Sequence, residues 1–430
     1  MADDISAADT PLPASGPAPD PASGAQQPLV YSRLESLDFT RGVAVMGILA
    51  ANIVGFGQPF LAYTWPGGFA TPLHAYDNWL WLAQFVLIDG KMRGLFTLLF
   101  GAGLVLFMDR AERRGDSGWR QVRRLAGLML FGLAHYFLLW RGDILTAYAA
   151  CGIVALLFLR LRAEALLAVG LIGYSAGALV YSAQFGALWA DWAPGGLSLS
   201  AELEELLAQE RADGAAEMLI ARDGSYFEYV EHAVHAHANE WLLMIAQLWL
   251  ETLPLMLIGM ALYRFGLFDG SVERRTQLRW GWIGVATGSL ATAALGLWVV
   301  RDGLSYSGSL FAFLGPSAFT RLPVVVGLAA LLAVAGQHVH GRLGRRTIAA
   351  GRMAFSNYIG TSLAMLFVFQ PPGLRLFGQL NRVELYVVVL FGCGAMLAWS
   401  KWWLARFNYG PLEWVWRCMT YGRRFPLKRH

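Results

Sequence analysis

Long apolar stretches dominate the chain and recur ten times. Windows of about 20 mostly apolar residues, the length that spans a bilayer as a helix, occur at residues 38–58, 78–108, 125–140, 144–159, 165–190, 241–263, 280–300, 322–338, 353–369 and 383–404. A segment of this length in lipid must satisfy its backbone polar groups within a helix. The pattern therefore predicts an all-α integral membrane protein with about ten transmembrane helices.

The second of these stretches, 78–108, carries charges inside it. A first apolar run ends at Ile88, the sequence Asp-Gly-Lys-Met-Arg occupies 89–93, and a second apolar run continues to Phe107. At about 1.5 Å per residue, the stretch is long enough to cross a bilayer once and too short to cross twice. Because an ionisable group inside a span is costly unless it is paired or faces a polar cavity, 89–93 is a candidate functional site.

Arginines concentrate in every second connection between the predicted spans. Six arginines lie between the second and third spans, four between the sixth and seventh, and four between the eighth and ninth. The connections on the other side hold only Arg141, Arg211, Arg222, Arg301, Arg321, Arg375 and Arg382. Because basic residues mark the cytoplasmic side, this alternation predicts that both termini are cytoplasmic and that 78–108 crosses the membrane once.

The remaining segments complete the expected organisation. Residues 1–30 are rich in Ala, Pro, Ser and Gly, with no basic segment or apolar core, so we expect a disordered tail and not a signal peptide. Spans one to five occupy 31–190 and spans six to ten occupy 239–405. The acidic segment between them, 191–238, is expected to form a helical extracytoplasmic cap, and 406–430 a cytoplasmic amphipathic segment.

Composition agrees with a membrane protein and removes several other classes. Hydrophobic residues make up 56% of the chain and charged residues 15%, against about a quarter charged in a soluble domain. The net charge of +4 is small, and no basic run interleaved with aromatics lies away from the membrane-flanking loops, so no nucleic-acid partner is expected. Cys151, Cys393 and Cys418 show neither a disulfide framework nor metal-ligand spacing.

Polar residues in the first span and after the last one form a first group of candidates. Asp38 and Arg41 are three residues apart, so they can pair on one helical face, either as a topology anchor or as part of a basic site for a phosphate-bearing ligand. Asn52, near the outer end of that span, either forms an interhelical hydrogen bond or takes part in chemistry. Glu413 and Arg417, flanked by tryptophans, are spaced to pair on an amphipathic helix at the inner interface.

Two outer loops carry a second group of candidates. His74 precedes Asp77 by three residues, and a carboxylate at that spacing can orient the imidazole of a general base. The alternative is a solvated loop histidine. Arg141 and Asp143 occupy the short corner between the third and fourth spans, just after His135, and form either a structural ion pair or a polar site.

A group of histidines, His232, His235 and His237, lies just before the sixth span. Imidazole suits zinc, but His235 and His237 point to different sides of a helix, so the spacing does not by itself meet zinc geometry. No metal site is predicted here, and these residues are expected to be solvated parts of the cap.

Six stretches together resemble the YeiB-like family of bacterial multi-pass membrane proteins. They are Leu37–Gly42 with Asn52, Lys91–Gly103, Gly142–Leu145, Gly259–Tyr263, Gly351–Tyr358 and Gly410–Arg417. The resemblance covers the chain in order from about residue 33 to 425 and implies a multi-pass protein of the bacterial inner (plasma) membrane. The phosphate loop, the dinucleotide fingerprint and the His-Glu-x-x-His zinc motif are all missing from the sequence.

That family is similar in its first half to a broader group of transmembrane acyltransferases, which includes the lysosomal heparan glucosaminide acetyltransferase. In that enzyme, an Asn at the end of the first span and a His in the following loop serve acetyl transfer from cytoplasmic acetyl-CoA to a lumenal sugar amine. Asn52 matches that Asn, and His74 is the histidine of the following loop, farther along it than in the acetyltransferase pattern. The resemblance implies an acyl-CoA-type donor and no permanently bound cofactor.

The leading hypothesis is therefore an inner-membrane acyltransferase, with an envelope sugar, lipid or small amine as acceptor. Its general base would be His74, oriented by Asn52 and Asp77. Its donor and acceptor sites would be lined by Asp38, Arg41, Lys91, Arg93, Arg141 and Asp143. The expected partners are the lipid bilayer and a small-molecule or lipid substrate, and a homodimer is left open.

The second hypothesis is a transporter or exporter of a small anionic solute. Its midplane site would be lined by Asp89, Lys91, Arg93 and Asp143. Inverted repeats with broken helices would support this class, and the sequence shows one interrupted span without a clear counterpart in its second half.

Overall fold

Regular structure in this protein is helical throughout the residues that the computed structural model describes, 26–115, 118–190, 200–339 and 341–429. The helices are α1 (Gln26–Gly57), α2 (Asp77–Leu87), α3 (Lys91–Arg113), α4 (Trp119–Leu138), α5 (Leu145–Ala155), α6 (Ala163–Ala190), α7 (Ser200–Asp223), α8 (Tyr226–His237), α9 (Glu240–Arg264), α10 (Arg274–Arg301), α11 (Tyr306–Leu314), α12 (Ser317–Gln337), α13 (Arg342–Arg352), α14 (Ala354–Phe369), α15 (Arg382–Leu404) and α16 (Pro411–Tyr421). The expected tail lies outside the described residues up to residue 25, and the start of the cap, 191–199, also lies outside them.

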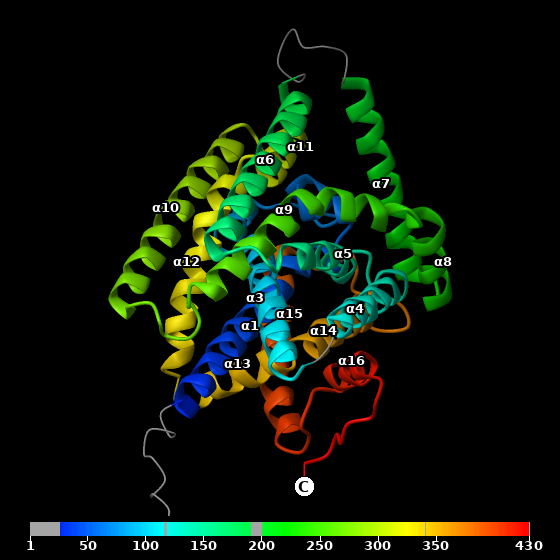
Figure 1. Ribbon diagram of the computed structural model, residues 1–430. Coiled ribbons are helices and arrows are strands. Elements are labelled where there is room, and N and C mark those ends of the chain that lie inside the picture. The colour runs from blue at the N-terminus through cyan, green and yellow to red at the C-terminus, as the bar shows by residue number, and fades with distance from the viewer. Residues whose placement is uncertain (1–25, 116–117, 191–199, 340, 430) are drawn as a thin grey trace, which may run out of the picture.

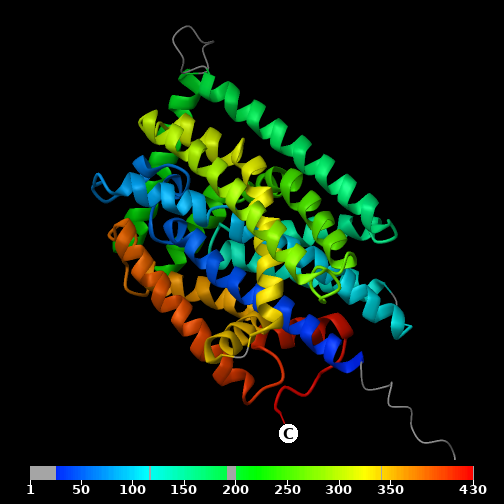
Figure 2. The same ribbon diagram turned by 90° about the vertical axis from the view of Figure 1, so that its left-hand side faces the viewer.

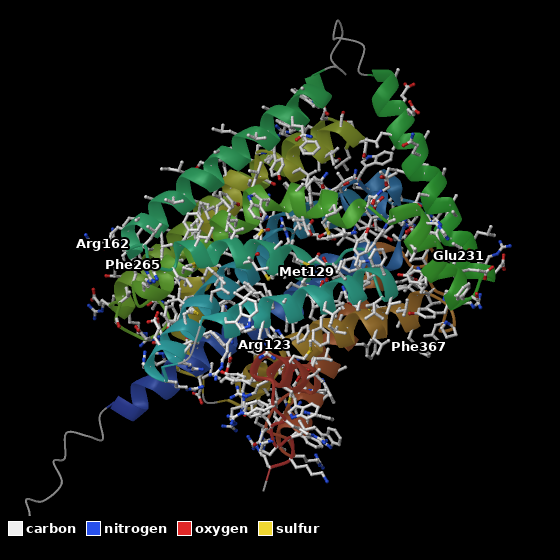
Figure 3. All side chains as sticks on the ribbon, turned by 45° about the vertical axis from the view of Figure 1, so that its right-hand side comes forward. Arg123, Met129, Arg162, Glu231, Phe265 and Phe367 are labelled. Atoms are coloured by element: carbon white, nitrogen blue, oxygen red, sulfur yellow. The ribbon has the colours of Figure 1, made fainter. Side chains whose placement is uncertain are left out.

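Each of the ten predicted spans is largely helical, and the second covers both α2 and α3. Seven helical stretches in the described residues are long and apolar enough to cross a membrane: Glu35–Gly57, Asp77–Arg113, Ala163–Ala187, Glu240–Arg264, Arg274–Arg301, Ser317–Gln337 and Arg382–Leu404. The other three predicted spans correspond to α4 and to the shorter apolar stretches Leu145–Phe158 and Ala354–Phe369. Large apolar side chains such as Phe367 project outward from the bundle (Figure 3), as lipid contact requires. The chain is an integral membrane protein.

The helices form one bundle with two distinct ends (Figure 1). α16 and the C-terminus lie at one end, where α1 also begins, and this is called the C-terminal end below. α7 rises at the opposite end, called the cap end. Figure 2, turned by a quarter, shows α10 and α12 side by side along one flank, where they pack against each other.

The second span is a helix broken at residues 88–90. α2 ends at Leu87 and α3 begins at Lys91, and Gly90 between them has a φ of +70°. Glycine adopts this left-handed conformation without strain, and a Cβ here would collide with the guanidinium of Arg321. Gly90 therefore permits the turn that places the charged stretch 89–93 inside the bundle.

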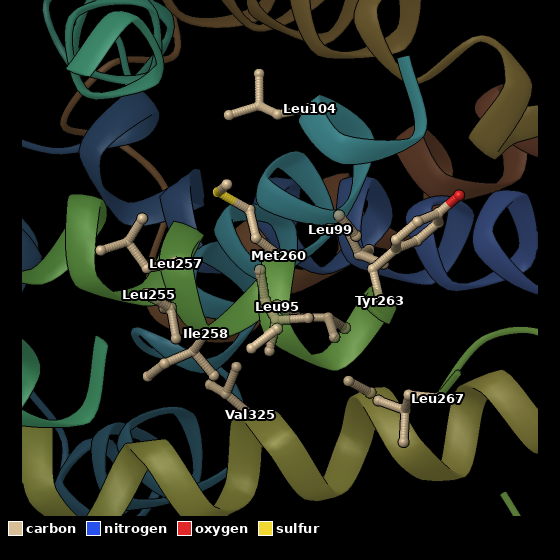
Figure 4. Close-up of a cluster of buried hydrophobic side chains, with 14 of the residues drawn as sticks. Leu95, Leu99, Leu104, Leu255, Leu257, Ile258, Met260, Tyr263, Leu267 and Val325 are labelled. Carbon is tan, nitrogen blue, oxygen red and sulfur yellow. The ribbon is translucent and has the colours of Figure 1, made fainter. Parts of the chain in front are cut away.

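The central core lies where α3, α9 and α12 meet (Figure 4). Leu95 of α3, Leu255 of α9 and Val325 of α12 belong to one buried cluster. Gly101 and Gly259 let α3 and α9 cross closely, because a Cβ on either would collide with a backbone carbonyl of the facing helix. Small residues at such crossings are typical of membrane helices, and this crossing fixes the frame that carries the site.

The described part of the expected cap consists of α7 and α8. α8 begins with a capping box, in which Ser225 and Glu228 each accept a hydrogen bond from the other's backbone N–H. The hydroxyls of Tyr226 and Tyr229 then donate to backbone carbonyls at the end of α4, at 2.8 and 2.9 Å. The cap therefore docks on the corner between α4 and α5.

Candidate functional site

Three buried side chains, Asp143, His135 and Ser362, form a hydrogen-bonded row inside the bundle. The Oδ1 of Asp143 lies 2.9 Å from Nδ1 of His135, and Nε2 of His135 lies 2.8 Å from Oγ of Ser362. None of the three residues is more than 2% exposed. In this order of carboxylate, imidazole and hydroxyl, a histidine can act as a base and a serine as a nucleophile.

The corner between α4 and α5 fixes the carboxylate of this row. The Oδ2 of Asp143 accepts hydrogen bonds from the backbone N–H and the hydroxyl of Thr146, at 2.8 and 2.9 Å. Gly132, three residues before His135, gives the corner room, because a Cβ there would lie 2.6 Å from the Thr146 nitrogen. Both oxygens of Asp143 are therefore held, one by the corner and one by the imidazole.

A small cavity lies beside Ser362. Its volume is about 10 Å³, and Asn52 and Phe56 of α1 line it together with Tyr358 and Ser362 of α14. That is room for about one water molecule. The ring of Tyr358 also packs against the imidazole of His135, with 5.1 Å between the ring centres. Asn52 thus faces the same space as the serine hydroxyl.

A much larger cavity, the arginine cavity, opens at the C-terminal end of the bundle. Its volume is about 410 Å³, and six arginines but only two acids line it. These charged residues are Asp38, Arg41, Arg110, Arg114, Arg124, Arg352, Glu413 and Arg417. Asp38 and Arg41 pair at 3.2 Å, as their spacing predicts. The excess of guanidinium groups suits a ligand that carries phosphate.

Close packing of α13 on α1 brings two of these arginines together. A Cβ on Gly351 would collide with the carbonyl of Asp38, and a Cβ on Gly42 would collide with the carbonyl of Thr347. The two glycines therefore let the helices touch along their backbones. Arg352, next to Gly351, consequently lines the same cavity as Arg41 of α1.

α16 forms another wall of the arginine cavity. Glu413 accepts hydrogen bonds from the backbone N–H groups of Phe355 and Ser356 at 2.9 and 3.0 Å, and so caps the first turn of α14. Arg417 lies over aromatic rings, including that of Phe425 at 4.7 Å. These are the partners the structure gives to Glu413 and Arg417, in place of the expected pairing with each other.

A narrower cavity, the aromatic cavity, continues from the arginine cavity into the bundle. Its volume is about 160 Å³, and it shares Arg41, Arg124 and Arg352 with the arginine cavity. Its deeper lining includes Phe96, Phe100, Tyr148, Phe355 and Tyr358. Tyr358 also lines the small cavity at Ser362 and so borders both spaces.

A fourth cavity, of about 40 Å³, lies under the cap. It shares Phe56 with the small cavity and is lined by Trp140, Arg141, Glu217, His232, His237 and Gln370 among others. The four cavities form a series from the arginine cavity, past Ser362, to the cap. Tyr358 borders both the aromatic cavity and the small cavity, and Phe56 borders both the small cavity and the cavity under the cap.

Arg141 holds the cap to the α4–α5 corner. Its guanidinium lies 3.1 Å from Oδ2 of Asp213 and 3.2 Å from Oε1 of Glu217, both on α7. Asp143, its neighbour in the corner, has His135 and Thr146 as partners instead. The two charges that the sequence places together therefore serve different parts of the structure.

Charges around Arg141 shift the protonation of the cap residues. Burial alone would raise the pKa of Asp213, but the hydrogen bond with His237 and the charge of Arg141 outweigh it and lower that pKa to about 2. Burial would lower the pKa of His237, yet its hydrogen bonds with Asp213 and Glu240 raise it to about 9. Burial raises the pKa of Glu217 to about 7 despite the attraction of Arg141.

The same cluster contains the one group of potential metal ligands found in the described residues. Ligand atoms of Asp213, His232 and His237 lie within 4.8 Å of one another, whereas His235 is exposed. A guanidinium nitrogen of Arg141 lies 3.0 Å from Nε2 of His237 and 3.1 Å from Asp213. A positive group in that place opposes the binding of a metal cation. The cluster is better described as a group of ion pairs that holds α7 to the α4–α5 corner.

The structure places the predicted base beside one predicted partner, Asp77, at an exposed loop, whereas the other, Asn52, is buried in α1. His74 lies in the loop before α2, and its side chain is 51% exposed. Its Nδ1 is 3.6 Å from Asp77, which accepts the backbone N–H of His74 at 2.7 Å. Asn52, in contrast, is buried and accepts a hydrogen bond from the Tyr63 hydroxyl at 3.4 Å.

The charges of the broken span belong to a buried polar network near α9 and α12. Arg93 donates to Glu251 at 2.6 Å, and Arg321 lies 3.8 Å from the same carboxylate. Asp89 accepts from Gln84, and Lys91 is fully buried. Lys91 and Arg93 are not among the residues that line the four cavities described above; Arg41 is.

Sequence reasoning singled out Asn52, Asp143 and the position of His135, but it missed Ser362. Ser362 is 227 positions from His135 in the chain, so no local spacing connects them. The available signal is the cluster of polar residues in an otherwise apolar span, where Ser356, Asn357, Thr361 and Ser362 all fall in α14.

The fold and its buried polar row define an all-helical integral membrane protein with a candidate reaction site in its interior. Residues 262–423, which include α14 and α16, match a family described as protein of unknown function (DUF418). The chain is similar to the uncharacterized protein YeiB of Escherichia coli (strain K12), at 32% identity over 90% of this chain and 95% of the relative.

It is also similar to the uncharacterized protein YxaH of Bacillus subtilis (strain 168), at 27% identity over 93% of this chain and 97% of the relative. The chain therefore belongs to the YeiB-like family. No solved structure matches it.

Proposed function

We propose that this protein is a membrane acyltransferase. It takes an acyl group from an acyl-CoA-type donor and delivers it to a sugar, lipid or small amine that arrives from the other side of the membrane. The observation that supports this proposal is the series of cavities that joins a cluster of arginines to the row of Asp143, His135 and Ser362.

The arginine cavity provides the donor site. A coenzyme A thioester carries phosphates at one end and a slender pantetheine arm with the acyl group at the other. Arg41, Arg124 and Arg352 stand where the wide cavity narrows into the aromatic cavity. They would hold the phosphates by charge-assisted hydrogen bonds while the arm enters the aromatic cavity. The positive-inside rule supports a cytoplasmic location for this end, where acyl-CoA is available.

The cavity under the cap provides the acceptor site. It reaches Phe56, which also borders the small cavity. Its lining combines the aromatic ring of Trp140 with the polar groups of Arg141, Glu217 and Gln370. Such a mixture suits a polar acceptor that carries hydroxyl or amine groups.

His135 is the base that the geometry supports best. Its Nδ1 faces the Asp143 carboxylate and its Nε2 faces the small cavity's serine, so the carboxylate orients the ring toward the serine. Asn52 lines the same cavity and would donate its amide hydrogen to the carbonyl oxygen under attack. His74, the base predicted from the sequence, is mostly in solvent and remains a competing assignment.

Acyl transfer by the purified protein separates these assignments. Full-length protein in proteoliposomes is supplied with radiolabelled acetyl-CoA, with glucosamine and an amine-headgroup phospholipid as acceptors. We expect label in an acceptor, and a loss of about 10²–10⁴-fold for His135→Asn, because a positioned general base contributes that much. His74→Ala should retain transfer. His338→Asn, a substitution at the end of α12, is the control for losses during purification and reconstitution and should also retain transfer.

The opposite ranking, with His74→Ala inactive and His135→Asn active, would show that His74, in the loop before α2, is the general base. Absence of both label transfer and calorimetrically measured CoA binding in the wild type would refute the acyltransferase.

Solute transport is the second candidate function, and one observation favours it. The predicted break in the second span is present, and its charges share a buried network with Glu251 and Arg321. Broken helices with buried charges are features of transporters. Flux of a small organic anion into proteoliposomes without any acyl donor, lost in Arg93→Ala, would support this class instead.

A further inference from the structure

We propose that Ser362 is the nucleophile of the reaction and carries the acyl group as a covalent ester between donor and acceptor. This inference rests on the proposed acyltransferase function and adds a second catalytic residue to it. Its basis is the position of the Ser362 hydroxyl, 2.8 Å from Nε2 of His135 and on the lining of the small cavity.

The hydrogen bonds of the row fit one arrangement of protons, in which Asp143 is the acceptor. The Oδ2 of Asp143 accepts two donors from Thr146, and its Oδ1 faces Nδ1 of His135. An ionised carboxylate only accepts hydrogen bonds, so Nδ1 carries the imidazole hydrogen. The lone pair of Nε2 is then free to accept the hydroxyl proton of Ser362. This is the tautomer in which histidine can deprotonate serine.

The first half of the reaction loads the serine. The Ser362 oxygen forms a bond to the thioester carbonyl carbon while its proton passes to Nε2 of His135. The carbon–sulfur bond then breaks, and the leaving thiolate takes the proton from the imidazolium. Free coenzyme A and an acyl-serine ester result, and the histidine is neutral again.

The second half unloads the serine. A hydroxyl or amine of the acceptor attacks the ester carbonyl and gives its proton to Nε2 of His135. The bond between carbon and the Ser362 oxygen breaks, and this oxygen regains the proton from the imidazolium. The acceptor leaves acylated, and the protein returns to its starting state with no further reactant needed.

The shape of the interior favours this relay over direct transfer. Tyr358 lines both the small cavity at Ser362 and the aromatic cavity, and Phe56 lines both the small cavity and the cavity under the cap. The space at Ser362 itself measures only about 10 Å³. Donor and acceptor therefore cannot occupy it together, and a movement of Tyr358 or Phe56 would make room there for an acyl group held on the serine.

The same hydrogen bonds would also hold α4 against α14 if the row served stability alone. Chemical trapping distinguishes the two roles. Full-length protein is incubated with radiolabelled acetyl-CoA and no acceptor, quenched in acid, and mapped by peptide mass spectrometry. We expect an acetyl group on Ser362 that survives neutral hydroxylamine and is released by alkaline hydroxylamine, as an oxygen ester behaves.

Three variants complete the test. Ser362→Ala should lose both the label and the transfer to glucosamine, whereas Ser317→Ala should keep both, because the hydroxyl of the buried Ser317 donates to the backbone carbonyl of Phe313, four residues earlier. Ser362→Cys should still be labelled, with its thioester now released by neutral hydroxylamine. This change in the sensitivity of the label to hydroxylamine cannot come from a structural role. It therefore tests the proposal even if Ser362→Ala does not fold.

Transfer to an acceptor that continues in Ser362→Ala, with no label on the wild-type protein, would overturn the covalent relay and leave the acyltransferase standing. A wild-type protein that neither binds nor transfers acetyl-CoA would overturn both.

Discussion

Removal of Arg141 should release the cap from the bundle. Its side chain is 12% exposed, and it makes ion pairs of 3.1 and 3.2 Å to Asp213 and Glu217, which are themselves about a fifth exposed. Removing one partner of a fully buried pair costs about 3–5 kcal/mol. Because these acids retain some water contact, we expect about 2–3 kcal/mol for Arg141→Ala, which raises the opening constant of the cap about 30- to 150-fold.

Hydrogen exchange measures this opening directly. Amides of α7 and α8 should exchange faster in Arg141→Ala by the stated factor, while those of α3 in the core serve as an internal reference. Arg222→Ala is the matched control, because that cap arginine is 77% exposed. Adding Glu217→Gln to Arg141→Ala should restore part of the protection, since it removes a carboxylate left without its partner. Unchanged exchange in Arg141→Ala would refute the claim that Arg141 holds the cap to the bundle.

Three further predictions concern pH, the donor site and helix packing. Burial raises the pKa of Glu217 from 4.5 to about 7, and hydrogen bonds to acids raise that of His237 from 6.5 to about 9. Both groups bind protons more tightly in the docked cap, so α8 should lose exchange protection as pH rises from about 4.5 to about 9. Arg41→Ala should raise KM for acetyl-CoA about 10- to 100-fold with less effect on kcat, and Arg41→Lys should do so less. Gly351→Ala should lower thermal stability by about 1–3 kcal/mol through its collision with α1, whereas Gly394→Ala, with open space around it, should not.

The helices could be predicted from the sequence because their signal is local. An apolar window of bilayer length requires a helix whatever surrounds it, and each predicted span is largely helical. The break at 88–90 was also readable, because a glycine between charges interrupts the apolar run. The amphipathic character of α16 predicts a helix, but the role of Glu413 as a cap for α14 depends on a helix more than fifty residues away.

The candidate site could be predicted only in part, because it is made by tertiary packing. Asn52 and Asp143 stand out as polar residues in apolar surroundings, and the structure places both beside the interior site. Their neighbours there, His135 and Ser362, come from helices far apart in the chain. An Asp three residues from His74 satisfied a local spacing rule, yet the loop holding His74 is largely in solvent. Spacing rules report neighbours along one helix and not partners across a bundle.

Sided labelling in proteoliposomes tests the proposed reaction most directly. Protein of known orientation receives radiolabelled acetyl-CoA on either the C-terminal face or the cap face. We predict that Ser362 becomes acetylated only from the C-terminal face, where the arginine cavity opens, and that glucosamine added at the cap face then removes the label. Acetylation from the cap face, or no acetylation from either side, would contradict the proposed route.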